Sequence, residues 1–261
     1  MDFRSQLGSV RRQVLGSLYS RRAPLGDGGP IVTFSFDDFP RSAYTVGGAV
    51  LKNFGARGTY YTAVGLMDTS NELGEQFRRA DLDALVDDGH ELASHTFSHI
   101  SSRSVSDLHF VEEVDRGRKA IQEMTGQSDS GNFAFPFGEF TLGARKILSG
   151  RLRSCRSIWG GFNGPEIDLS LLRANSLYGD NHNAEAAKQL ILQNKKRKSW
   201  LIFYTHDVRP DPSRFGCTTS LLESVISFAS HSGARILTVD EVLTEITGAA
   251  HRDSLAAGVT A

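Results

Sequence analysis

The chain has few of the features that mark several large classes of protein. Its 261 residues include two cysteines, which cannot form a disulfide framework, and we interpret Cys155 and Cys217 as buried thiols or incidental loop residues rather than as metal ligands. No run approaches the ~20 consecutive apolar residues of a membrane-spanning helix. Because 29 basic residues stand against 30 acidic ones, a nucleic-acid-binding surface is not expected. The length and the 39% of apolar residues suit a single α/β barrel.

The two ends of the chain differ from its body. Residues 1–24 are predicted to form an amphipathic helix, because apolar residues recur at steps of three and four among several arginines. Two interpretations stay open, namely packing on the domain body and peripheral contact of residues 3–22 with an anionic membrane. Arginines interrupt any stretch that resembles a secretory signal, so a cytoplasmic location is expected. Residues 249–261 carry no aromatic anchor and are expected to be poorly ordered.

Between residues 25 and 248, segments typical of strands and of helices alternate. The expected strands are 31–36, 58–64, 91–94, 132–135, 154–158, 171–176, 199–205 and 235–239. The expected helices are 46–55, 82–89, 106–126, 141–150, 183–198, 218–233 and 240–248. Seven or eight βα units predict one parallel sheet curved into a barrel. In such barrels the functional groups gather at the carboxyl ends of the strands.

Two imidazoles and a carboxylate are placed to share a metal ion. His95 and His99 follow one expected strand, and a helical turn there would put both rings on one face. Asp37 or Asp38, at the end of the first expected strand, would supply a third ligand and leave its neighbour free as a base. Each pattern alone is weak, because aspartates also begin turns and histidine pairs also occur at surfaces. His206, at the end of a late strand, strengthens the combination.

In their order along the chain, these segments resemble the motifs of the polysaccharide deacetylase family, also called carbohydrate esterase family 4. The matching segments are Ser35-Phe36-Asp37-Asp38, His95-Thr96-Phe97-Ser98-His99, Pro136-Phe137-Gly138 and the apolar strand that ends in His206-Asp207. The resemblance covers roughly residues 30–247 and implies a single distorted (β/α)7 barrel. The third motif has no arginine and is similar to that of the branch that acts on poly-N-acetylglucosamine.

The resemblance also implies a reaction and a role for each matching position. The implied metal ligands are Asp38, His95 and His99. The metal would be Zn²⁺, or Co²⁺ as an alternative, and it would activate the attacking water. Asp37 would be the general base and His206 the general acid, while the Phe137 N–H would help to hold the oxyanion. The implied substrate is an N-acetylated sugar of a polysaccharide, an oligosaccharide or a lipid-linked glycan precursor, and the implied product is acetate.

Two positions depart from the family's pattern. The arginine that begins the third motif and orients the base is replaced by Ala134, and Arg173 is the candidate substitute, with a plain surface arginine as the alternative. The fourth motif, whose carboxylate supports the acid histidine, is not recognisable. Asp168 and Asp180 are candidates for that carboxylate, and Trp159 lies near the expected position of the motif's tryptophan.

Three functions therefore stay open on the sequence. The first is a metal-dependent glycan N-deacetylase. The second is a hydrolase of another C–N or ester bond on the same scaffold, such as that of a cyclic ureide, a formamide or an O-acetyl ester. The third is a non-catalytic carbohydrate-binding module, which the presence of both Asp37 and His206 disfavours.

Overall fold

The structure, a computed structural model, describes the backbone of residues 18–257 and the side chains of residues 18–248. The helix predicted over residues 1–24 lies mostly outside this range, so membrane contact through residues 3–22 stays a prediction. The last residues of that segment form a strand instead, because β1 (Arg22–Pro24) pairs antiparallel with β9 (Glu166–Asp168). Within the described residues, no helix has both the length and the apolar character needed to cross a bilayer.

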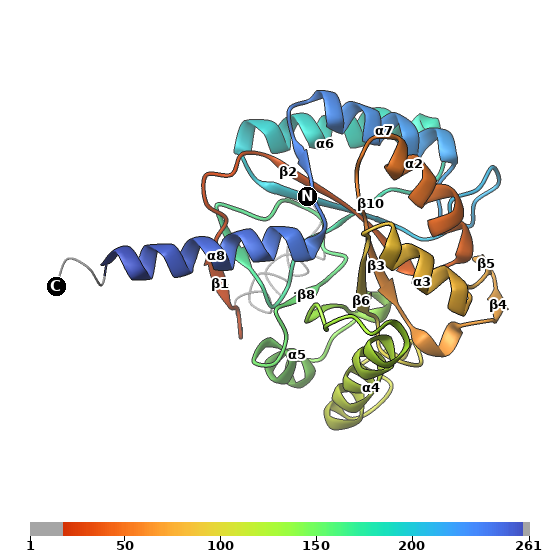
Figure 1. The fold of residues 1–261 in the computed structure, drawn as a ribbon, viewed down its shortest axis with the longest axis horizontal. Coiled ribbons are helices and arrows are strands. Elements are labelled where there is room, and N and C mark those ends of the chain that lie inside the picture. Colours follow the sequence, from red (N-terminus) through yellow and green to blue (C-terminus); the bar gives the residue numbers. More distant parts are fainter. Residues whose placement is uncertain (1–17, 258–261) are drawn as a thin grey trace, which may run out of the picture.

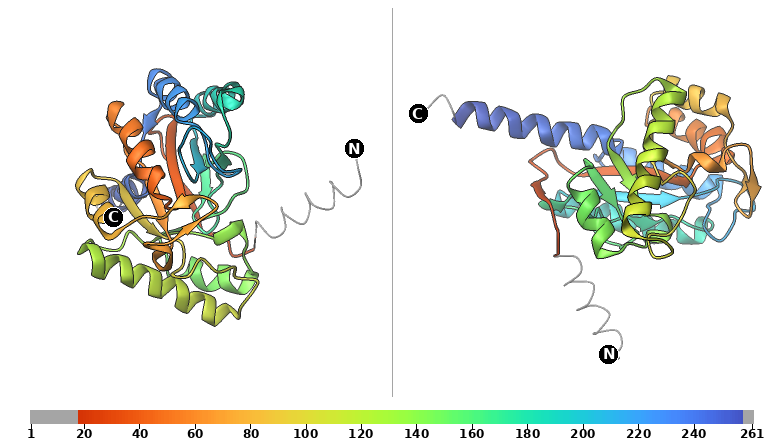
Figure 2. Two further views of the ribbon diagram at one scale, coloured as in Figure 1. Left: turned by 90° about the vertical axis from the view of Figure 1, so that its right-hand side faces the viewer. Right: turned by 90° about the horizontal axis from the view of Figure 1, so that it is seen from below.

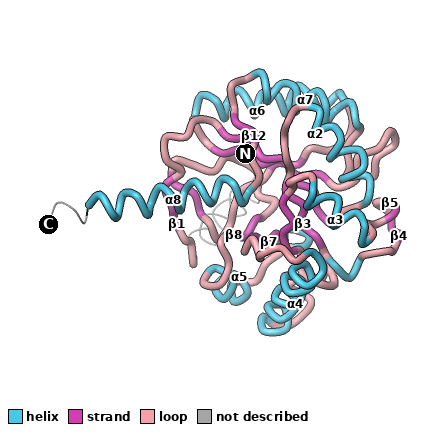
Figure 3. The backbone as a smooth tube through the Cα atoms, in the orientation of Figure 1, coloured by secondary structure: helices cyan, strands magenta, loops and turns pink. Residues whose placement is uncertain are grey.

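A curled sheet of parallel strands forms the centre of the molecule (Figures 1 and 3). Its strands are Ile31–Asp38 (β2), Thr59–Thr62 (β3), Glu91–Ser94 (β6), Asn132–Ala134 (β7), Ser154–Arg156 (β8), Asn175–Ser176 (β10), Trp200–Thr205 (β11) and Arg235–Ile236 (β12). The strand order is β10-β11-β2-β3-β6-β7-β8, and β12 pairs with the start of β2, where β3 does not reach. Apolar and aromatic residues make up half of β2 and most of β11, and both strands are buried along their whole length.

The sheet approaches closure through an irregular segment rather than through a further long strand. β8 and β10 lie at the two ends of the strand order. Leu172 forms a parallel bridge to Arg156 in β8, and the chain then runs on into β10, beside β11. The segment 172–176 therefore spans the gap, which confirms the predicted α/β class and distorted barrel.

Helices cover the outer face of the sheet (Figures 1 and 2). The helix predicted over 106–126 is confirmed as α4. Ser106 accepts a hydrogen bond from the His109 N–H at its start, and Gly126 ends it with a φ of 68°. α4 spans Asp107–Thr125. The other helices are Ala49–Asn53 (α2), Arg79–Asp87 (α3), Leu142–Ser149 (α5), Ala184–Arg197 (α6), Thr219–His231 (α7) and Val239–Ala257 (α8). Short helical turns occupy Ala43–Gly48 (η1), Val64–Leu66 (η2), Pro136–Gly138 (η3) and Asn181–Asn183 (η4), and a hairpin joins Ser70–Asn71 (β4) to Gly74–Glu75 (β5).

Two predicted helices differ from the structure. The helix predicted over 46–55 is split into the π-helical turn η1 and the short helix α2. The helix predicted to end at Gly248 continues to Ala257, so most of the tail predicted to be poorly ordered is helical; residues 258–261 lie outside the described range. Figure 2 shows the second half of α8 projecting from the body of the molecule.

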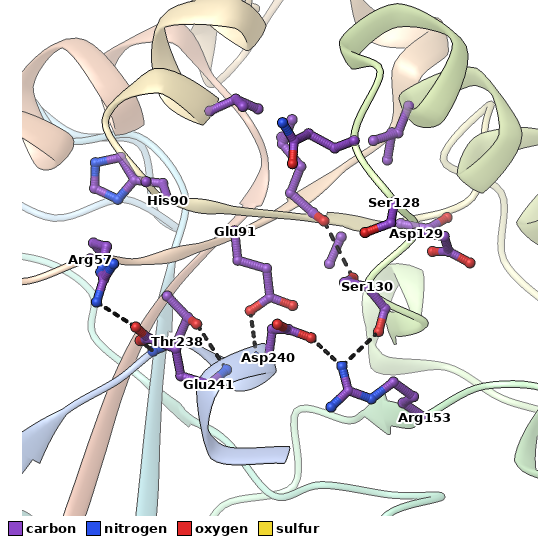
Figure 4. Close-up of a pocket in the computed structure, with 17 residues that line it drawn as sticks. Arg57, His90, Glu91, Ser128, Asp129, Ser130, Arg153, Thr238, Asp240 and Glu241 are labelled. Carbon is purple, nitrogen blue, oxygen red and sulfur yellow. Dashed lines mark hydrogen bonds and ion pairs between the residues drawn. The ribbon is translucent and has the colours of Figure 1, made fainter. Parts of the chain in front are cut away.

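A polar cavity of about 430 Å³ lies at the amino-terminal ends of β6, β7 and β8, opposite the strand ends at which the predicted site residues stand (Figure 4). The carboxylate of Glu91, on β6, accepts hydrogen bonds from the Thr59 hydroxyl (2.8 Å), the Asn132 amide (2.7 Å) and the Asp240 N–H (2.9 Å). Because Asp240 is in the first turn of α8, these bonds tie that helix to the sheet. Burial raises the pKa of Glu91 to about 7.

This raised pKa predicts a specific dependence of stability on pH. Glu91 binds a proton more tightly in the folded chain than at its ordinary value of 4.5, so its contribution is present below pH 4.5 and is lost as the pH rises to about 7. The expected loss is on the order of 3 kcal/mol. In Glu91→Gln this part of the pH dependence should disappear, as measured by urea unfolding between pH 4.5 and 7.5.

The exposed Glu223→Gln on α7 is the matched control and should follow the wild-type profile. Parallel profiles for wild type and Glu91→Gln across this range would contradict the prediction.

Candidate active site

A second cavity, of about 270 Å³, lies at the carboxyl ends of the strands. It is lined by Asp37, Asp38, Asn71, Glu72, Leu73, His95, His99, Phe137, Gly138, Ile158, Tyr178, Tyr204, His206 and Phe215. The lining includes every residue predicted as a metal ligand, general base, general acid or oxyanion donor, whereas it does not include the candidates Arg173, Asp168, Asp180 and Trp159. The parallel sheet brings these side chains together because β2, β6, β7 and β11 all end on this side.

Asp38, His95 and His99 form a compact set of ligand atoms. The Asp38 Oδ1 lies 3.0 Å from the Nε2 of His99 and 3.4 Å from the Nε2 of His95. One ligand atom from each residue lies within 4.8 Å of the other two. Asp38 and His95 are buried, and His99 is partly exposed to the cavity. The set therefore has three converging ligands and one open side.

The hydrogen bonding of His95 shows that this set suits a cation. Its Nδ1 lies 2.8 Å from the Ala134 carbonyl oxygen, which can only accept, so Nδ1 carries the proton. Burial lowers the pKa of His95 to about 4, which keeps the ring neutral and leaves a lone pair on Nε2. That lone pair faces the buried Asp38 Oδ1, which accepts no hydrogen bond. Two acceptors in contact are stabilised by a cation between them, so these residues fit a divalent metal.

Left-handed backbone conformations concentrate at these strand ends. Five of the eight non-glycine residues with positive φ in the described chain lie here, namely Asp38 (64°), Phe39 (67°), Thr96 (63°), His99 (51°) and Phe137 (59°). In a regular strand, the adjacent Asp37 and Asp38 would point to opposite faces. The φ of 64° at Asp38 turns the chain, so that both carboxylates line one cavity. Such backbone is costly, and it clusters at functional sites.

Asp37 is held by an arginine that was not predicted. The Arg156 Nη2 donates to both Asp37 oxygens, at 2.5 and 2.6 Å, and both residues are buried. The Arg156 guanidinium lies 4.7 Å from the centre of the Tyr61 ring and 5.1 Å from that of Tyr204. This contact between two aromatic faces fixes the guanidinium and keeps Asp37 in one orientation.

The prediction that Arg173 takes the place of the missing arginine is therefore wrong, because Arg156 takes it. Arg173 is exposed, and its Nη1 donates to the Gly160 carbonyl oxygen at 3.0 Å. Arg156 on β8 pairs in register with Ala134 on β7, the position that lacks the arginine. The guanidinium thus comes from the neighbouring strand, across a small alanine. The signal in the sequence was an arginine inside the expected strand 154–158.

His206 is supported by the backbone rather than by a carboxylate. Its Nδ1 lies 3.1 Å from the Phe215 carbonyl oxygen, which leaves Nε2 for the cavity. The two predicted supporting carboxylates lie elsewhere: Asp168 forms an ion pair with Arg145 (2.7 Å), and Asp180 accepts a hydrogen bond from the His182 N–H. Neither substitutes for the fourth motif.

The remaining predicted residues have mixed positions. Phe137 lies in the turn η3, where the residue is 59% exposed and its ring centre lies 4.5 Å from that of His99. Trp159 does not line the cavity and packs against Phe140, with ring centres 5.4 Å apart. Cys155 and Cys217 are free buried thiols, as predicted, and burial raises the pKa of each to about 12.

The chain is similar to known carbohydrate deacetylases in both sequence and fold. The sequence pattern of the polysaccharide deacetylase family matches residues 26–150. A search of curated protein sequences found no match. The chain shares its fold with the chitin deacetylase of the fungal pathogen Colletotrichum lindemuthianum, at 19% identity over 82% of this chain and 88% of that one, with a TM-score of 0.59.

Two further solved structures, one of them a pseudoenzyme, have a similar fold. One is the Xyl-CE4 domain of a multidomain xylanase from the hindgut metagenome of Trinervitermes trinervoides (19% identity, 85% of this chain and 92% of that one, TM-score 0.58). The other is a mutant of a CE4 family pseudoenzyme (14% identity, 83% of this chain and 68% of that one, TM-score 0.54). Because a pseudoenzyme shares the fold, the fold alone does not establish catalysis.

The ligand set predicts metal binding that depends on His99. Replacing it with alanine should weaken Zn²⁺ or Co²⁺ binding by more than about 100-fold, since even the loss of an outer partner of a ligand costs 10–100-fold. His206→Ala removes an imidazole from the same cavity but not from the ligand set, and it should bind within a few-fold of wild type. Calorimetric titration checks both, and equal losses in the two variants would contradict the assigned ligands.

The Arg156–Asp37 contact predicts a loss of stability that a second substitution repairs. Arg156→Ala should destabilise the fold by about 3–5 kcal/mol, because it leaves the buried Asp37 carboxylate without its partner. Adding Ala134→Arg should recover a large part of this loss, because the new guanidinium starts from the register-paired position.

Urea unfolding of the wild type, of each single variant and of the double variant measures this coupling. Ala134→Arg alone should destabilise the chain by overpacking a filled interior. If the two substitutions changed the free energy of unfolding additively, an arginine at position 134 would not take over the role of Arg156, and the prediction would be wrong.

Proposed function

We propose that this protein is a metal-dependent deacetylase of N-acetylated glycans that releases acetate, because residues 26–150 match the sequence pattern of the polysaccharide deacetylase family. One observation carries the proposal. Three groups line the same cavity at the ends of β2, β6 and β11: a set of three metal-ligand atoms, an arginine-held carboxylate and an imidazole. A fold kept for structural reasons alone would not need all three.

The metal's contribution is electrostatic. A divalent ion on Asp38, His95 and His99 would polarise the acetamide carbonyl and lower the pKa of water at the site. The chain's own residues then move the protons. Asp37, which the Arg156 guanidinium holds in one orientation, takes the proton of the attacking water.

His206 acts on the leaving group. With its Nδ1–H directed to the Phe215 carbonyl oxygen, it presents Nε2 to the cavity. In its protonated form it donates from Nε2 to the departing amine, which an amide needs because an unprotonated amine leaves poorly. The Phe137 N–H, in the tight turn after β7, is the proposed donor to the oxyanion.

The cavity's size and lining support a sugar substrate. About 270 Å³ accommodates one sugar ring with its acetamido group, and the rings of Tyr178, Tyr204 and Phe215 offer flat faces on which a sugar can pack. We propose an oligosaccharide, a polysaccharide or a lipid-linked glycan precursor as the substrate, with Zn²⁺ or Co²⁺ as the metal.

Acetate release from N-acetylglucosamine oligomers by the Zn²⁺- or Co²⁺-loaded protein tests the proposal. Asp37→Asn and His206→Ala should each lower kcat by about 10²–10⁴-fold, the range for loss of a general base or acid. Arg173→Ala is the matched control, because this arginine is exposed and does not line the cavity, and its rate should equal that of the wild type. A metal-loaded protein that releases no acetate from any acetylated glycan would refute the assignment.

A further inference from the structure

One wall of the catalytic cavity comes from the hairpin β4–β5. Asn71, Glu72 and Leu73, at its tip, all line the cavity. The Asn71 side-chain oxygen accepts hydrogen bonds from the Leu73 N–H (2.9 Å) and from the Gln76 amide (3.0 Å). These two bonds close the tip on itself, so the wall has a defined shape.

Arg209 ties this hairpin to the strand end that carries the candidate acid. Its Nη2 donates to the Glu72 carbonyl oxygen at 3.2 Å, and its Nε lies 2.8 Å from the Asp207 Oδ2. Asp207 is fully buried and directly follows His206. Gly74 has a φ of 101°, a backbone conformation that residues other than glycine rarely adopt, so glycine suits this turn of the hairpin. The backbone of Glu72 is therefore held in a fixed position relative to the strand end that carries His206.

Glu72 carries the one charge of the cavity lining that nothing in the described chain balances. Asp37 is paired with Arg156, and Asp38 lies between two imidazoles. Within the described residues, the Glu72 carboxylate has neither an ion pair nor a hydrogen bond, whereas Glu75 on the same hairpin pairs with Arg78 at 3.1 Å. A negative charge thus remains at one side of a cavity whose lining also includes apolar and aromatic side chains, among them Tyr178, Tyr204 and Phe215.

A carboxylate without a partner, beside aromatic side chains on which a sugar ring can pack, favours a ligand that has both a sugar ring and a positive charge. Neutral N-acetylated sugars lack that charge, and carboxylated or phosphorylated sugars would be repelled. An amino sugar with a free ammonium group has both properties.

We propose that Glu72 binds the ammonium of an already deacetylated sugar next to the N-acetylated one, so that the protein prefers partly deacetylated glycan. The inference rests on the proposed function, because that reaction would itself create the neighbouring amine. An exposed ion pair of this kind corresponds to a preference of about two- to fivefold at low salt. Screening makes the preference fall as ionic strength rises.

Binding tests the inference without any need for turnover. The probe is a glucosamine tetramer, titrated calorimetrically at pH 6 and low salt into wild type, Glu72→Gln, Glu72→Lys and the matched hairpin control Glu75→Gln. Glu72→Gln should weaken binding by about two- to fivefold, Glu72→Lys should weaken it further, and Glu75→Gln should match the wild type. High salt should remove the difference between wild type and Glu72→Gln. Equal affinity of all four proteins at low salt would overturn the inference.

Turnover separates this inference from the proposed function. The measured quantity is the ratio of kcat/KM for an oligomer with one free amine beside its acetamido group to that for the fully acetylated oligomer. The ratio should be about two to five in wild type and about one in Glu72→Gln. Acetate release with the same ratio in both proteins would refute the role of Glu72 and leave the deacetylase function intact. Glucosamine binding that depends on Glu72, without acetate release from either oligomer, would refute the function and support the binding site.

Discussion

The buried ion pair between Asp37 and Arg156 constrains the rest of the site. Two charges inside the barrel are stable only as partners, so each fixes the position of the other. The pair in turn needs flat faces beside the guanidinium and a small residue below it, which Tyr61, Tyr204 and Ala134 supply. With one carboxylate of the Asp-Asp pair held in this way, only its neighbour is free to face the two imidazoles. The different contacts of the two adjacent aspartates therefore follow from where one arginine lies.

Much of this site could be predicted because each of its residues is marked by the residues next to it in the sequence. Asp37, Asp38, His95, His99 and His206 each directly follow a hydrophobic run, and parallel strands end on the same side of a sheet. Once the alternation of strands and helices is recognised, convergence of these residues follows from topology. Helix boundaries with a capping serine and a closing glycine were predictable for the same reason, as α4 illustrates.

Long-range information could not be read in this way. The partner of Asp37 is chosen by the register between β7 and β8, and one sequence does not state which residues of two strands lie side by side. Arg173 was predicted in place of Arg156, although both arginines lie in expected strands of the second half of the chain. The partner of His206 was hidden for a different reason: it is a backbone carbonyl, which every residue has, so no residue type at position 215 could signal it.

The left-handed backbone conformations at Asp38, Phe39, Thr96, His99 and Phe137 limit how far the stability of this protein can be raised by substitution. Each would be relaxed by glycine, and the three hydrophobic or β-branched members are poorly suited to that backbone. Yet these are the bends that bring adjacent side chains onto one surface. A substitution that relaxes one of these residues would therefore raise the stability of the fold but disturb the geometry of the cavity. Stabilising substitutions are better placed at the opposite ends of the strands.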